Sequence, residues 1–180
     1  MSDAARKVTD LFIELATQAG KPITPLEVQK LLYFTEGLHL ALTDAPLFDE
    51  DFQAWQFGPA LPSVYRRLRR FEGRPISHLI VDAKSITEVS EPLMRIARSV
   101  YDLFSKYDPE KLVGLTHLPG TPWDVVRELH NVPKGEPSQY PIDTDLIAEW
   151  FRAKWDRSLE SSTDEIIVES PDEFPEWAAA

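Results

Sequence analysis

One helix in the first quarter of the chain limits the fold more than any other segment. Residues 25–42 place apolar side chains around most of a helical circumference. Thr24 can act as the N-cap by accepting a backbone N–H. Pro25 suits the first helical position, because a backbone N–H there has no acceptor within the helix and proline loses nothing by lacking it. A helix that is apolar nearly all round must be covered on several sides. The sequence therefore predicts a fold built around this helix.

Other segments show the helical spacing of one buried face, and prolines stand where several of them begin. These segments are residues 4–16, 93–107, 109–113, 122–129 and 144–155. Their pattern predicts a mainly α fold, a compact bundle of about six helices around the central apolar helix.

A short stretch between the long helices has a different period. Residues 51–57 alternate and end at Gly58-Pro59, which favours a strand, and residues 78–81 are the only plausible second strand. We expect a small two-stranded β element on the helical body.

The chain length and the distribution of charge suggest one domain followed by a tail. The 180 residues suffice for a single domain, which we place at residues 1–158. The net charge is −11, and residues 159–180 hold seven acids and no base. We expect this segment to be an acidic, flexible C-terminal arm, although Ile166 to Val168 interrupt its polarity.

Several classes of protein are disfavoured by what the sequence lacks. The chain has no cysteine, which removes disulfides and thiolate metal sites. It has no apolar run of about 20 residues and no signal core, so we expect a cytoplasmic protein with no membrane contact. It has no phosphate-binding glycine loop, nucleophile elbow or zinc-protease motif, and its four histidines are scattered. We expect neither catalysis nor a cofactor nor a metal.

Charge also argues against direct binding of nucleic acid. The chain is acidic overall, and its apolar second helix offers only Gln29 and Lys30 for contact with bases or phosphates. For these two residues we favour ordinary exposure to solvent over a role at a partner surface.

Two further features leave alternatives open. Trp55 and Phe57 form either an exposed aromatic anchor for a partner or, as we favour for Trp55, a plug under the β element. Five arginines lie within residues 66–74, on a short helix with a narrow apolar stripe. This face could bind phosphates or carboxylates, be a solvated face with its charge balanced by the nearby acids of residues 49–51, or dock the chain's own acidic arm. We favour the second of these.

A combination of motifs resembles one family. The motifs are Leu26-x-x-Gln29-Lys30-Leu31-Leu32-Tyr33-Phe34, the segment from Pro46-Leu47-Phe48 to Trp55, Gly58-Pro59, Tyr65, Pro75-Ile76 and Thr116-His117 with Trp123. Together they resemble the Panacea domain, which includes SocA-like antitoxins and phage-associated proteins. The resemblance covers about residues 5–155. Ala60 departs from it, because valine is expected after Gly58-Pro59.

The resemblance implies an antitoxin that neutralises a cognate toxin by direct protein binding. In the SocA case it also implies a proteolytic adaptor that delivers the toxin to the ClpXP protease. The alternative is a phage- or plasmid-associated interaction module or transcriptional regulator with another target. A structural role for His117 is favoured over a site. The acidic arm could cover the toxin, dock on the arginines, or carry a degradation signal in its last residues.

Candidates for contact with a partner come from the motifs, the arginine helix and the arm. They are Gln29, Lys30, Tyr33, Trp55, Phe57, Gly58, Pro59, Tyr65, Arg66, Arg70, His117, Trp123, Phe174 and Trp177.

Overall fold

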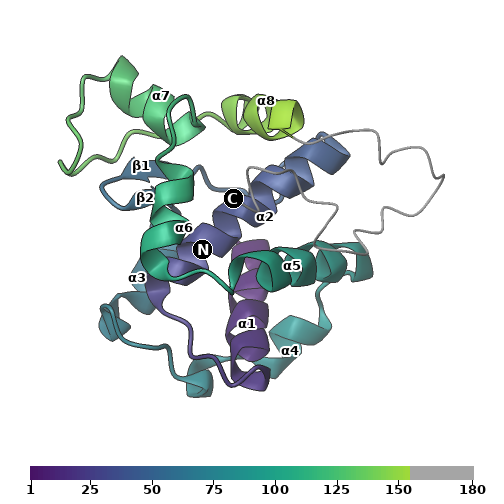
Figure 1. The fold of residues 1–180 in the computed structure, drawn as a ribbon. Coiled ribbons are helices and arrows are strands. Elements are labelled where there is room, and N and C mark those ends of the chain that lie inside the picture. Colours follow the sequence, from purple (N-terminus) through teal and green to yellow (C-terminus); the bar gives the residue numbers. More distant parts are fainter. Residues whose placement is uncertain (155–180) are drawn as a thin grey trace.

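A computed structural model describes residues 1–154 and shows a mainly helical molecule with one short hairpin, which confirms the predicted fold class (Figure 1). Within these residues the elements are α1 (Asp3–Gln18), α2 (Pro25–Thr43), β1 (Gln53–Trp55), β2 (Gly58–Ala60), α3 (Pro62–Leu68), α4 (Ala83–Thr87), α5 (Glu91–Phe104), α6 (Pro109–Thr116), α7 (Pro122–Leu129) and α8 (Thr144–Lys154). Two 3-10 turns, η1 (Arg69–Phe71) and η2 (His78–Ile80), lie between α3 and α4.

Helix α2 runs through the centre of the molecule, as the sequence predicts. It packs against α1, α3, α5, α6, α8 and β2. Its buried side chains come from every side of the helix, and the Phe34 ring stacks on Phe104 of α5 at 4.0 Å between centroids. Burial on all sides accounts for the nearly continuous apolar sequence of this helix.

The predicted cap of α2 is present, and other helices begin in a similar way. The Thr24 side chain and Glu27 form a reciprocal capping box at α2, and Pro25 occupies the first turn. Asp108 caps α6 and Thr121 caps α7, each followed directly by a proline. Asp143 accepts a hydrogen bond from the backbone N–H of Asp145 at 2.8 Å and so caps α8.

The hairpin differs from the prediction in its second strand. β1 pairs antiparallel with β2, with Trp55 opposite Gly58 across a two-residue turn, whereas residues 78–80 form the turn η2. Ser77 caps η2 through the N–H of Leu79, whose side chain is 93% exposed. Gly58 and Pro59, expected to end the extended segment, therefore belong to the second strand, and the turn lies at Gln56 and Phe57. Proline is tolerated in β2 because this strand is an edge of the sheet.

The other side of β1 is also paired. The N–H of Ala54 donates to the carbonyl of Tyr140 at 2.8 Å, and the N–H of Ile142 donates to the carbonyl of Phe52 at 2.7 Å. The loop before α8 thus ties the end of the described chain to the hairpin.

Helix α8 lies along the second half of α2 and requires a glycine there. A Cβ atom on Gly37 would overlap the Phe151 ring, so the two helices approach closely only because residue 37 has none. Arg152 pairs with Asp44 at 2.7 Å, at the end of α2. Trp155, which the sequence places on this helix, and the whole of the predicted arm lie outside the described residues.

Candidate functional site

Two polar side chains of α2 hold the hairpin from one side. The Gln29 amide donates to the carbonyl of Leu61 at 3.1 Å and accepts from the N–H of Leu61 at 2.8 Å. Lys30 donates from Nζ to the carbonyl of Pro59 at 3.0 Å. Gln29 is 6% exposed and Lys30 is 1% exposed. The expectation that both side chains face solvent is therefore wrong. Their polar groups instead form hydrogen bonds with backbone groups in and next to β2, which are buried and need partners.

Helix α7 holds the hairpin from another side. The indole N–H of Trp123 donates to the carbonyl of Trp55 at 2.7 Å, and Arg127 donates from Nη1 to the carbonyl of Ala54 at 3.0 Å. The Arg127 guanidinium also lies over the Trp123 ring, with Cζ 4.8 Å from the centroid. The ring of His117 stacks on Trp123 at 3.6 Å between centroids. His117 thus has a place in the packing of α7.

Gly58 allows the hairpin to lie this close to the helices. Its φ is +94°, and a Cβ atom there would stand 2.5 Å from both Lys30 Nζ and Thr116 Oγ1. Both the left-handed backbone and the close approach favour glycine at this position.

Beside the hairpin lies a groove of about 590 Å³. Its walls come from the start of α2, the hairpin, α3 and the loop 137–139, and its aromatic side chains are Trp55, Phe57 and Tyr65. The rings of Trp55 and Tyr65 meet edge to face at 4.9 Å. Phe57 at the turn is 60% exposed and Tyr65 is 46% exposed. Large aromatic surfaces left in water around a concave site are typical of a surface that binds another molecule.

A buried lysine amine lies in the lining of this groove. Burial lowers the pKa of Lys30 to about 7, because the amine has left water and its one described hydrogen-bond partner is a carbonyl. Burial likewise lowers the pKa of His117 to about 4, and the charges of Lys30 and Arg127 lower it further. Near neutral pH, His117 is therefore uncharged.

The arginine helix forms the outer wall of the groove and is only partly paired. Arg67 forms an ion pair with Asp10, whereas Arg66, Arg69 and Arg70 are exposed. Glu50 instead caps α3 by accepting from the N–H of Ser63 at 3.0 Å. Most of these arginines face solvent, as favoured, but within residues 1–154 no ion pair joins them to residues 49–51, so the expected pairing with these acids is wrong.

The structure brings together only some of the predicted candidates. Those that line the groove are Gln29, Lys30, Trp55, Phe57, Gly58 and Tyr65. Trp55 is only half-buried at the groove, whereas the sequence favoured a plug in the core.

The other candidates lie elsewhere. Pro59 and Trp123 are buried in the contacts that hold the hairpin. Tyr33 is 2% exposed and contacts Phe52 and Phe151 in the core, out of reach of a partner. Arg66 and Arg70 are exposed on the arginine helix, and Phe174 and Trp177 lie outside the described residues.

Sequence reasoning missed Arg127 and the contribution of Pro25 and Leu26 to the groove. Arg127 follows Trp123 by four residues on a predicted helix, a spacing that places both side chains on one face. That spacing was the available signal. The sequence contains no signal that the loop 137–139 lies at the groove, because the position of this loop depends on backbone pairing between residues distant in sequence.

Replacing Gln29 by leucine is expected to lower the free energy of unfolding by about 2 kcal/mol, because a buried N–H and a buried carbonyl of Leu61 lose their partner. Urea unfolding measures this, with Gln139→Leu as a control because Gln139 is exposed. Equal stability of the two variants would contradict the role given to Gln29.

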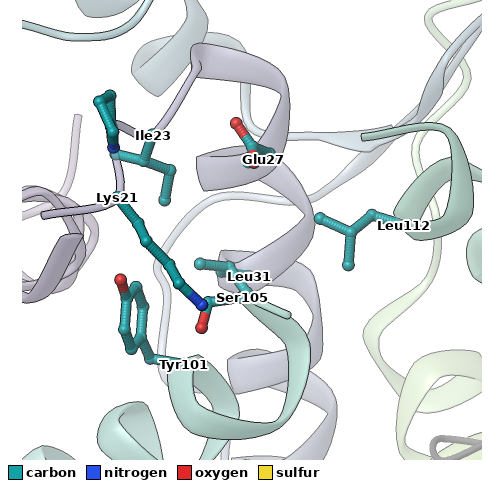
Figure 2. A pocket seen from close by; sticks show the side chains of 8 residues that line it. Lys21, Ile23, Glu27, Leu31, Tyr101, Ser105 and Leu112 are labelled. Carbon is teal, nitrogen blue, oxygen red and sulfur yellow. The ribbon is translucent and has the colours of Figure 1, made fainter. Parts of the chain in front are cut away.

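A second cavity, of about 30 Å³, lies between the α1–α2 turn and α5. Figure 2 shows the Lys21 side chain extending to Ser105 beside the ring of Tyr101. The space suits about one water molecule and no larger ligand.

Residues 1–154 contain neither a cluster of metal ligands nor a membrane-spanning helix. No three His, Asp or Glu residues gather closely enough to hold a metal ion. No helix of this part is both long and apolar enough to cross a membrane.

Comparison with known proteins identifies the family. Residues 28–124, which include most of α2, the hairpin and most of the side chains that hold it, match the family described as antitoxin SocA-like, Panacea domain. The chain is also similar to Antitoxin SocA of Caulobacter vibrioides, with 32% identity over 134 residues, 68% of this chain and 69% of that protein. No solved structure matches the chain significantly. The chain belongs to the antitoxin SocA-like, Panacea domain family.

Proposed function

We propose that this protein is an antitoxin that neutralises a cognate toxin protein by binding it directly through the groove beside the hairpin. The family supports the antitoxin role, since the similar Caulobacter protein is named as an antitoxin. The observation that carries the choice of surface is the exposure of Phe57 at the tip of a hairpin whose backbone is held firmly from below.

The groove suits an extended or helical segment of a protein. It presents three aromatic side chains around a concavity, and aromatic anchors contribute much of the free energy at protein interfaces. The hairpin backbone has no further freedom to lose, because Gln29, Lys30, Trp123 and Arg127 already fix it. A prearranged surface of this kind binds with a smaller entropy cost. Occlusion of the toxin then suffices for neutralisation.

The test begins with capture of the tagged protein from its native host, with and without nuclease treatment, and expression of the captured small protein alone. A partner that stops growth alone and is rescued by this chain would support the proposal. Rescue in cells that lack ClpXP separates neutralisation by binding from delivery to the protease. Recovery of polymerase subunits or nuclease-sensitive complexes would overturn it in favour of a regulator.

Phe57→Ala and Tyr65→Ala are each expected to weaken toxin binding at least 10-fold, because each removes an aromatic anchor worth about 2 kcal/mol. Calorimetric titration of the toxin measures this. Leu79→Ala is the matched control, since Leu79 is 93% exposed and lies on η2, away from the groove. Unchanged binding by both aromatic variants would place the toxin on another surface and leave the antitoxin role standing.

A further inference from the structure

Three exposed arginines lie between the groove residues Tyr65 and Glu72 in the sequence and have no carboxylate partner among residues 1–154. Within residues 1–154, no ion pair involves Arg66, Arg69 or Arg70, and Arg70 lies over the Phe71 ring with Cζ 5.0 Å from the centroid. Arg69 follows Tyr65 by four residues, so both lie on one side of the helix. Since Tyr65 lines the groove, Arg69 lies along its rim. The groove is therefore mostly apolar and aromatic inside, with Arg69 along its rim and the acidic residue Glu72 also in its lining.

The chemistry of this surface selects an acidic segment with aromatic anchors. A ring would fill the concavity beside Trp55 and Tyr65, and neighbouring carboxylates would meet the guanidinium groups, which bind carboxylates well. Residues 159–180 have this composition: seven acids, no base, and the aromatic residues Phe174 and Trp177 among Asp172, Glu173 and Glu176.

The length of chain beyond α8 is sufficient to reach the groove. Lys154 ends α8 near the C-terminal end of α2, where Arg152 pairs with Asp44, and the groove lies at the N-terminal end of α2. The 19 residues of α2 span about 28 Å. Twenty residues separate Lys154 from Phe174, and even a coiled chain of that length spans about 25 Å on average, an extended one more than twice that. The tether thus brings the anchors to the groove at high effective concentration.

From these observations we propose that residues 159–180 dock in the groove of their own chain, with Phe174 and Trp177 in the aromatic concavity and the acids against Arg66, Arg69 and Arg70. The segment then competes with any protein that uses the same surface. An antitoxin regulated in this way keeps its aromatic groove covered until a partner displaces the segment. The docking itself requires no toxin, so its test is independent of the proposed function.

Disulfide trapping in the full chain tests this docking without background, because the protein has no cysteine. Ser170→Cys places one thiol beside the anchors. Gly73→Cys places the other at the groove, at a position where a side chain meets open space. The control is Gly114→Cys on α6, which is exposed, equally unobstructed and away from the groove. We expect the pair 170–73 to close at least 10-fold faster than the pair 170–114 in mild oxidant.

Two sets of variants establish which groups are responsible. Phe174→Ala with Trp177→Ala, and separately Arg69→Glu with Arg70→Glu, should each remove the 10-fold preference, and 0.5 M salt should reduce it because exposed charges are screened. Arg98→Glu, an exposed arginine on α5, should leave it unchanged. Equal closure rates at positions 73 and 114, or a preference insensitive to the anchor variants, would overturn the proposal. So would covalent dimers in place of intramolecular bonds, because a second copy would then fill the groove.

Discussion

Replacing Lys30 by methionine is expected to abolish a rise of about 3 kcal/mol in the free energy of unfolding between pH 7 and pH 10. The pKa of Lys30 is lowered to about 7 by burial, whereas the unfolded chain restores it to about 10.4. At pH 7 the folded amine is about half protonated; as the pH rises towards 10 it loses the rest of its proton, whereas the unfolded amine keeps most of its own. Stability therefore increases with pH by about 1.4 kcal/mol per unit.

Urea unfolding of both chains at pH 7, 8.5 and 10 measures the effect as the difference between them, which cancels the titration of other groups. Methionine retains most of the volume of the lysine stem but not the donor to Pro59, so its cost is constant with pH. Parallel stability curves for the two chains would contradict a depressed pKa.

Glu36 provides a control with the opposite sign. It is 3% exposed, accepts a hydrogen bond from the N–H of Leu47 at 3.1 Å, and its pKa is raised to about 7 by burial. Between about pH 4.5 and 7 the folded carboxyl keeps a proton that the unfolded one releases, so this group lowers stability as pH rises. Glu36→Gln should remove that acid-side decrease and leave the alkaline rise of Lys30 intact.

Gly37→Ala is expected to lower the free energy of unfolding by about 3 kcal/mol and to loosen α8 from α2. The added Cβ atom would overlap the Phe151 ring, which is 3% exposed and packs edge to face on Tyr33 at 5.7 Å. The ring is enclosed by the core and has little room to move, so the backbones of the two helices must separate. Thermal unfolding and amide exchange of residues 144–154 measure the two effects.

Gly114→Ala is the matched control. Gly114 lies in α6, and a Cβ atom there meets no atom within 4 Å. Since alanine favours a helix over glycine, this variant should gain about 0.5–1 kcal/mol. If Gly37→Ala and Gly114→Ala changed the free energy of unfolding in the same direction, the overlap with Phe151 would not be what destabilises the Gly37 variant.

The helices could be predicted from sequence because their signals are local. Thr24, Asp108 and Thr121 stand directly before a proline, and the apolar spacing fixes which face is buried. The second strand could not be predicted in this way. A three-residue strand that contains proline has no β pattern of its own, and β2 exists because Gln29 and Lys30 pair with the backbone around it.

In the candidate site, too, the residues with a local signal could be predicted from sequence, and those that depend on distant contacts could not. Phe57 and Tyr65 stand out in the sequence as aromatic residues beside a turn and on a charged helix, and both line the groove. Gln29 and Lys30 were expected in solvent because a polar residue on an apolar helix usually ends there. Their burial depends on acceptors 29 and 32 residues further along the chain, which no local pattern contains.

The hairpin is fastened by its main chain, and this has a consequence for how such a protein acquires new targets. The side chains of Gln29, Lys30, Trp123 and Arg127 all bind backbone carbonyls or an N–H of residues 54–61. None of these contacts uses the side chains of Gln56 and Phe57, which lie at the turn and line the groove. Substitutions at the turn can therefore change what the surface recognises while the hydrogen bonds of the scaffold stay as they are. At Gln56 and Phe57, unlike at Gln29, Lys30 and Gly58, recognition can change separately from the contacts that hold the hairpin.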